Sequence, residues 1–138
     1  MICRTSTVLS TRNDHGHCLL CGERNPSSLK LAFQGHADGS VTTRFQAGRG
    51  LQGYSEILHG GVIASLLDAA MTHCLFHHGV QALTGDLQVR FLKPIPFSAE
   101  INLSAEIVGS HPPLYKLKSF AEVDRQLMAR GTGKFMRS

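Results

Sequence analysis

The chain has 138 residues, of which 42% are hydrophobic and 17% charged, and it carries a formal net charge of +4. This composition excludes a mostly disordered chain, and the length suits one domain with its own core. No apolar run approaches the ~20 residues of a membrane span or forms a signal-peptide core, so we expect a cytoplasmic protein that binds no membrane. The positive charge suits an anionic ligand, but scattered basic residues and the absence of Trp argue against nucleic acid as a partner.

The polar residues 1–28 predict a loose N-terminal arm or a short helix, which leads into a single domain over residues 29–138. Within the arm, Cys18 and Cys21 have the CxxC spacing and follow two histidines, His15 and His17. One interpretation is half of a zinc site or a redox pair, and the other is a structural turn that buries two small side chains. Because structural zinc takes four ligands and no second CxxC follows, we favour the turn and predict no metal.

Two strands are predicted before residue 46. Residues 29–33 (LKLAF) alternate between apolar and polar side chains, as in a strand with one buried face. Residues 36–40 (HADGS) have turn chemistry, and residues 41–45 (VTTRF) are rich in strand formers. We therefore expect a hairpin, followed by a glycine-rich loop that leads to residue 59.

A helix over residues 61–77 is predicted by the stretch HGGVIASLLDAAMTHCLFHH, with Gly79 as a left-handed C-cap. This helix is apolar on almost every side, so we expect it inside the protein. Asp68 is the only charged residue between Gly60 and Thr72, and a buried carboxylate is costly unless it is paired or opens onto a site. Histidines lie near the helix end, but the HExxH motif is absent and no metal is predicted there.

The pattern after the helix changes to a period of two residues. It predicts four strands, at residues 82–92, 101–108, 115–123 and 126–135. In the first of these we expect Leu83, Leu87, Val89 and Phe91 to share one face and Gly85 to mark a bulge or a close approach of another segment. Strands segregated from one helix predict an α+β domain whose sheet wraps the helix, and its edge strand favours pairing with a second copy.

The helix start and Asp68 carry the candidate chemistry. Gly60 and Gly61 expose N–H groups at the positive end of the helix dipole, which suits an acyl carbonyl or a phosphate, and Asp68 suits a general base or nucleophile. Gly60 and Asp68 are about 12 Å apart along a helix, too far to act on one carbonyl carbon. Two antiparallel helices would bring Gly60 to Asp68 of the partner subunit, which predicts a homodimer with shared sites. Plain turn chemistry and a structural hydrogen bond fit the pattern equally well.

The stretch HGGVIASLLDAAM, followed by LTGDLQVRFLKPIP, resembles hotdog-fold thioesterases of the PaaI type over roughly residues 16–136. The opening CLLCGERNPSSLKLAF also resembles that of many family members, which favours a family turn over a metal site. The resemblance implies a hotdog fold, a curled antiparallel sheet around a central helix. It also implies a homodimer or a dimer of dimers that hydrolyses acyl-CoA thioesters without a cofactor.

The family's site residues transfer to this chain by motif position. Asp68 takes the place of the general base or nucleophile, and the Gly60 N–H takes that of the group that polarises the thioester carbonyl. His59 would shape this oxyanion hole, Gly61 would lie beside the substrate, and Thr84 would hold the attacking water. The resemblance thus implies that acyl-CoA is the substrate.

The loop before the helix departs from the family pattern. Related enzymes often carry Asn or Gln six residues before the HGG histidine, where this chain has Gly53, with Gln52 as a neighbour that substitutes if the loop is offset. The candidates for binding the coenzyme A phosphates are Arg49, Arg90 and Lys93, although solvated surface charge explains each one equally well. Because Gly53 lacks the helper side chain, the alternative to a thioesterase is a hotdog protein that binds acyl-CoA without turning it over. A hydratase is a third hypothesis, but no His is placed to partner Asp68.

Overall fold

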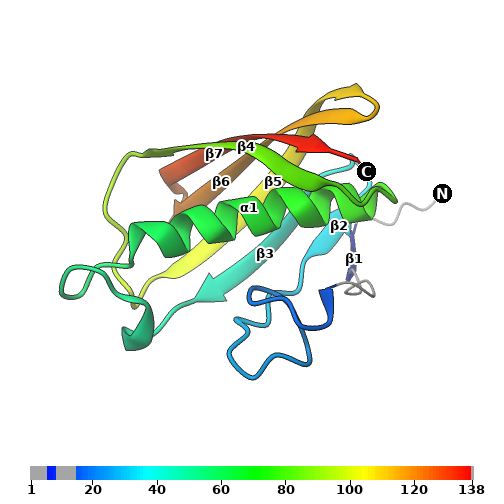
Figure 1. Ribbon diagram of the computed structural model, residues 1–138. Coiled ribbons are helices and arrows are strands. Elements are labelled where there is room, and N and C mark those ends of the chain that lie inside the picture. The colour runs from blue at the N-terminus through cyan, green and yellow to red at the C-terminus, as the bar shows by residue number, and fades with distance from the viewer. Residues whose placement is uncertain (1–5, 9–14, 138) are drawn as a thin grey trace.

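In the computed structural model, residues 6–8 and 15–137 are described. They form a seven-stranded antiparallel sheet that curls around one α-helix (Figure 1), as predicted for an α+β domain. The sheet order is β1-β2-β3-β5-β6-β7-β4, which leaves β4 at one edge. The elements are β1 Ser6–Val8, β2 Gln34–His36, β3 Val41–Gln46, the 3-10 helix η2 Arg49–Leu51, α1 Gly60–His77, β4 Leu83–Phe91, β5 Glu100–His111, β6 Leu114–Val123 and β7 Gln126–Met136.

Helix α1 begins and ends within one residue of the predicted bounds. His59 is the N-cap, and Gly79 follows the helix with a φ of 75°, the left-handed conformation that glycine adopts without strain. The helix buries Leu66, Leu67 and Met71, each at most 1% exposed. Among the described residues, no helix is long and apolar enough to cross a membrane.

The core lies between α1 and the concave face of the sheet. Alternate residues of β5, β6 and β7 are buried, as the period of two predicted. Small residues on β7 let the helix approach the sheet: a Cβ on Gly131 would lie 3.3 Å from Cβ of Leu67, and one on Gly133 would lie 3.0 Å from Cε of Met71. The β7 glycines therefore set the spacing between helix and sheet.

The prediction of a strand at residues 29–33 is wrong, since β2 begins only at Gln34. Residues 29–33 run instead along the N-terminal segment, where the Leu31 N–H donates to the Leu20 carbonyl at 3.0 Å. Lys30 has a φ of 58°, which an extended strand cannot contain. Leu31 and Phe33 are nevertheless buried. The alternation of apolar and polar residues therefore predicted correctly which side chains are buried, but not that the backbone pairs in a sheet.

The predicted N-terminal arm is tied to the domain where it is described. β1 pairs with β2, and Cys21 is 3% exposed within the core. Residues 1–5 and 9–14 of the arm lie outside the described part of the chain. The predicted boundary between the arm and the domain, at residue 28, stays a prediction.

Candidate active site

Asp68 lies in the middle of α1, partly buried, and opens toward β4. Its Oδ1 accepts a hydrogen bond from the Thr84 hydroxyl at 2.7 Å. Burial raises the pKa of the Asp68 carboxyl above its ordinary value, and the hydrogen bond from Thr84 acts in the opposite direction. The helix therefore presents a carboxylate that is a stronger base than one in water, with a hydroxyl held against it.

A bulge in β4 turns Thr84 toward Asp68. The β4–β7 register shifts between Thr84 and Asp86, which confirms the bulge predicted at Gly85. Because residues opposite each other in a ladder share a face, Thr84 shares the inner face with its partner Phe135, which is fully buried. Without the extra residue, Thr84 would face solvent on the outer side of the sheet.

The same bulge corrects the prediction that four apolar residues of β4 share one face. Leu83 pairs with Met136 on the outer face and is 73% exposed. Leu87 and Val89 pack against the core, whereas Phe91 is 52% exposed at the inner end of the strand. The extra residue at the bulge reverses the side on which every residue before it projects.

At the helix start, the two glycines are not equivalent. The His59 Nδ1 accepts a hydrogen bond from the Gly61 N–H at 2.8 Å, so this N–H is already satisfied. The Gly60 N–H has no hydrogen-bond acceptor among the described residues. A Cβ on Gly60 would lie 3.7 Å from the Phe91 ring. The N-terminus of α1 thus presents one unused N–H beside an exposed aromatic ring, at the positive end of the helix dipole.

One chain does not bring Gly60 and Asp68 to the same point. They belong to one continuous helix, and eight residues correspond to about 12 Å along its axis. Within the chain, Thr84 accompanies Asp68 and Phe91 accompanies Gly60, because β4 returns alongside the helix. Phe91 was predicted only to share one face of its strand with Leu83, Leu87 and Val89. Its position at the end of the strand after HGG was the available signal for its place near the site.

The loop before the helix uses Gln52 to hold its own shape. The Gln52 Oε1 accepts a hydrogen bond from the Glu56 N–H at 2.7 Å. Gly53 lies directly against His59, because a Cβ there would be 3.3 Å from the His59 Cα. Position 53 is therefore close to the free N–H of Gly60, and it offers no side chain to it.

The three candidate cations lie at different places. The Arg49 guanidinium stacks over the Phe97 ring, 5.2 Å from its centroid. Arg90 pairs with Arg130, and both are exposed on the outer face of the sheet, away from α1. Lys93 is exposed just beyond β4. Within one chain, Arg90 is thus separated from the Gly60 end of the site by the sheet itself.

Comparison with solved structures defines the architecture as a hotdog fold. A crystal structure of a thioesterase superfamily protein has a TM-score of 0.82 at 24% identity, covering 87% of this chain and 60% of that chain. A mutant of the phenylacetic acid degradation protein PaaI from Thermus thermophilus has a TM-score of 0.68 at 18% identity, covering 72% and 86%. The smu.793 protein from Streptococcus mutans UA159, bound to acetyl CoA, has a TM-score of 0.69 at 18% identity, covering 72% and 82%.

The sequence comparisons point to thioesterases of this fold. Residues 56–110, which include the HGG motif, Asp68 and Thr84, match the model of the thioesterase superfamily. Acyl-coenzyme A thioesterase THEM4 from Rattus norvegicus is 31% identical over 75 residues, which are 54% of this chain and 32% of the rat protein. The chain thus spans about a third of the length of the curated relatives it matches. The predicted resemblance to PaaI-type hotdog thioesterases is confirmed.

Proposed function

We propose that this chain forms an acyl-CoA thioesterase, which hydrolyses the thioester to a free acid and coenzyme A. The observation that carries the proposal is the partly buried Asp68 carboxylate with the Thr84 hydroxyl 2.7 Å from it. The unused Gly60 N–H on the same helix supports it. The superfamily match over residues 56–110 and the name of the rat relative point to the same reaction.

The proposed site needs two copies of the chain. Gly60 and Asp68 are too far apart on one helix, and an antiparallel second helix would place Gly60 opposite Asp68 of the partner subunit. Strand β4 suits such pairing, because it is the sheet edge beside both site residues and ends in the exposed Phe91, which the exposed Leu92 follows. The proposed unit is a homodimer with two sites, which can associate further into a dimer of dimers.

In the proposed mechanism, Thr84 and Asp68 hold a water molecule, and Asp68 accepts its proton as the oxygen attacks the thioester carbon. Negative charge then develops on the carbonyl oxygen, where the Gly60 N–H of the other subunit donates a hydrogen bond. His59 holds the Gly61 N–H and so keeps the helix start in shape. Collapse of the intermediate breaks the carbon–sulfur bond, and the coenzyme A thiolate leaves. In a variant of this route, Asp68 itself attacks and water hydrolyses the resulting anhydride.

The proposed substrate contacts follow from the same arrangement. Gly61, Gln52 and Gly53 lie around the Gly60 end, where the thioester would sit. Arg49 and Lys93 flank that end on the loop before α1 and beyond β4, and are proposed to bind the phosphates of coenzyme A. Because Arg90 faces outward within its own chain, it can contribute only where the coenzyme crosses the edge of the sheet.

The direct test is thiol release from a panel of acyl-CoA substrates. We expect Asp68→Asn and Asp68→Ala to lower kcat by about a hundredfold or more, the usual effect of losing a general base. Asp86→Asn is the matched control, because Asp86 lies on the outer face of β4 and is exposed. Unchanged hydrolysis in both Asp68 variants would rule out this mechanism.

A second candidate is a hotdog protein that binds acyl-CoA without hydrolysing it. Two observations favour it: Gly53 offers no side chain to the carbonyl, and the Gln52 Oε1 is engaged by Glu56. The structural neighbour bound to acetyl CoA has the same fold. Saturable acyl-CoA binding with no thiol release across chain lengths would select this function instead.

A further inference from the structure

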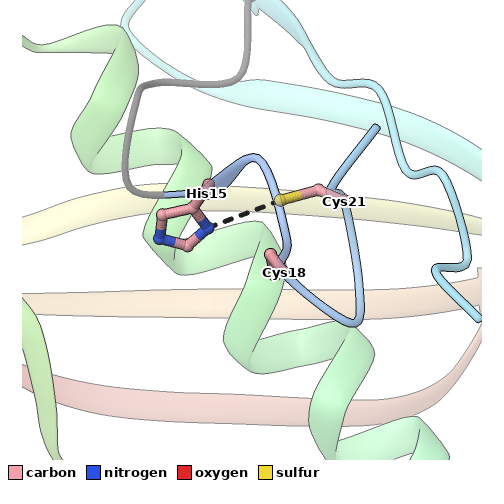
Figure 2. A group of neighbouring side chains, drawn as sticks. All are labelled: His15, Cys18 and Cys21. Atoms are coloured by element: carbon pink, nitrogen blue, oxygen red, sulfur yellow. Dashed lines mark hydrogen bonds between the residues drawn. The ribbon is translucent and has the colours of Figure 1, made fainter. Parts of the chain in front are cut away.

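Three metal-ligating side chains meet in the N-terminal segment, away from the proposed active site. The ligand atoms of His15, Cys18 and Cys21 all lie within 4.8 Å of one another. The Cys21 Sγ lies 3.5 Å from His15 Nδ1, and Figure 2 shows these two side chains pointing toward each other. The CxxC spacing that the sequence offered as half a zinc site thus gains a histidine ligand in three dimensions.

A tight turn holds the two cysteines together. The Cys18 N–H donates to the His15 carbonyl at 3.1 Å, and the Gly22 N–H donates to the Cys18 carbonyl at 2.8 Å. A Cβ on Gly22 would collide with the backbone of Cys18, so the turn can close this tightly only with glycine. The backbone therefore presets the positions of His15, Cys18 and Cys21.

A second imidazole, that of His73 on α1, stands next to this group. His73 is 2% exposed, and its ring centroid lies 6.3 Å from that of His15. Neither ring nitrogen of His73 has a hydrogen-bond partner among the described residues. Phe33 and Phe76 pack against the same ring, with centroids 4.8 and 5.1 Å away. A buried imidazole without a hydrogen-bond partner is unusual, and a metal ion bound by one of its ring nitrogens would satisfy it.

The donor set selects the class of metal. Two thiolates with imidazoles suit zinc, and the group contains no carboxylate such as calcium or magnesium would require. Tetrahedral zinc with Zn–S bonds of about 2.3 Å separates two sulfurs by about 3.8 Å. The ligand atoms of His15, Cys18 and Cys21 already lie within 4.8 Å of one another and need to close by only about 1 Å. A redox role suits the group less well, because Cys21 is 3% exposed and reactive thiols are accessible.

We propose that His15, Cys18 and Cys21 bind a zinc ion, with His73 of α1 as the fourth ligand. Such a site fastens the N-terminal segment to the helix that carries Asp68. It revises the sequence interpretation, in which the CxxC formed a metal-free turn. The proposal does not depend on the thioesterase proposal, since zinc would be structural and His73 lies five positions after Asp68 along the helix.

The test uses the full chain, purified without a histidine tag under reducing conditions. We expect elemental analysis to find about one zinc per chain, and Co²⁺ added after chelation to give the sulfur-to-cobalt absorption of a two-thiolate site. Cys18→Ser and Cys21→Ser should each lose the metal, and His73→Phe should weaken its binding while filling the aromatic pocket. His17→Ala is the matched control, because His17 is exposed in the same segment.

The outcomes separate cleanly. A zinc-dependent increase in the melting temperature of wild type and His17→Ala, but not of Cys21→Ser, would support the site. A chain that holds no zinc and shows no thiolate-to-cobalt absorption after reconstitution would overturn it. Loss of metal equally in His17→Ala would also overturn the ligand assignment. None of these measurements uses acyl-CoA, so they stand apart from the test of the enzyme.

Discussion

At the scale of single residues, Asp68 carries a charge that burial makes unfavourable for stability, at a position beside Thr84 that suits catalysis. Burial raises its pKa, which means that the folded protein favours the protonated carboxyl more than the unfolded chain does. The contribution of Asp68 to stability is therefore fully present below its unfolded pKa and is lost as pH rises through the folded pKa. In its ionised form Asp68 therefore costs stability, as expected for a residue kept for chemistry.

We expect Asp68→Asn to be more stable than wild type at pH 8, because it removes this buried charge and keeps an oxygen for Thr84. The difference in free energy of unfolding should shrink as pH falls and vanish once Asp68 is protonated in both states. Urea unfolding at several pH values measures it, with Asp86→Asn as the control. A stability difference that grows toward acidic pH contradicts the sign derived for Asp68.

Thr84 tunes the same carboxyl through its hydrogen bond, which lowers the pKa of Asp68. Thr84→Ala should therefore shift the acid limb of the kcat/KM profile to higher pH. It should also lower kcat/KM at neutral pH by about ten- to a hundredfold, because the attacking water loses a partner. Thr84→Ser keeps the hydroxyl, so it should leave the acid limb of the kcat/KM profile at its wild-type pH and retain most of the rate. If the profiles of the two variants coincide, Thr84 acts only in packing.

At the scale of elements, the bulge in β4 decides which residues face α1. The single extra residue puts Thr84 on the inner face and Leu83 on the outer face. Gly85 itself does not need to be glycine for steric reasons, since a Cβ there would lie at an ordinary distance of 3.5 Å from the Lys134 carbonyl. The number of residues in the strand therefore matters more than the side chain at the bulge.

Deletion of Gly85 should restore a regular ladder and turn Thr84 outward. We expect hydrolysis to fall at least as far as in Thr84→Ala. Gly85→Ala, which keeps the extra residue, should stay close to wild type. Thiol release measures the effect, and circular dichroism checks that the sheet is intact. Full activity in the deletion variant would show that the bulge does not position Thr84.

At the scale of the whole molecule, the question is whether one site draws on two chains. Gly60 is the first residue of α1, and its predecessor His59 has a φ of −61° and a ψ of 134°, which proline tolerates in the residue before it. Gly60→Pro thus removes the N–H at the helix position where proline fits best. Gly60→Ala keeps the N–H and serves as its control.

We expect Gly60→Pro and Asp68→Ala to be inactive alone and to recover activity when unfolded together and refolded as mixed dimers. In each mixed dimer, Gly60 of one chain meets Asp68 of the other, and the second site lacks both groups. Random pairing of equal amounts gives about a quarter of wild-type activity. Thiol release and light scattering together measure this recovery. No recovery, with dimers present, would place the site within a single chain.

The local pattern of apolar and polar residues in the sequence determined most of the helix and strand positions. The apolar stretch after His59 predicted α1 to within one residue. Strand-forming residues predicted β3, and the period of two predicted the strands from β4 to β7. The same alternation at residues 29–33 marked Leu31 and Phe33 as buried but wrongly predicted a strand. Periodicity reports which side chains avoid water, and it does not say which backbone satisfies the hydrogen bonds.

Only the tertiary structure decided which groups meet. His59 satisfies the Gly61 N–H and leaves that of Gly60 unused, although the two glycines are alike in sequence. The His15 group gains its neighbour His73 only because the N-terminal segment packs on α1, 58 residues further along the chain. Spacing in a sequence fixes neighbours within one turn of helix or one strand. Contacts between distant segments depend on how the sheet closes around the helix, which no local pattern records.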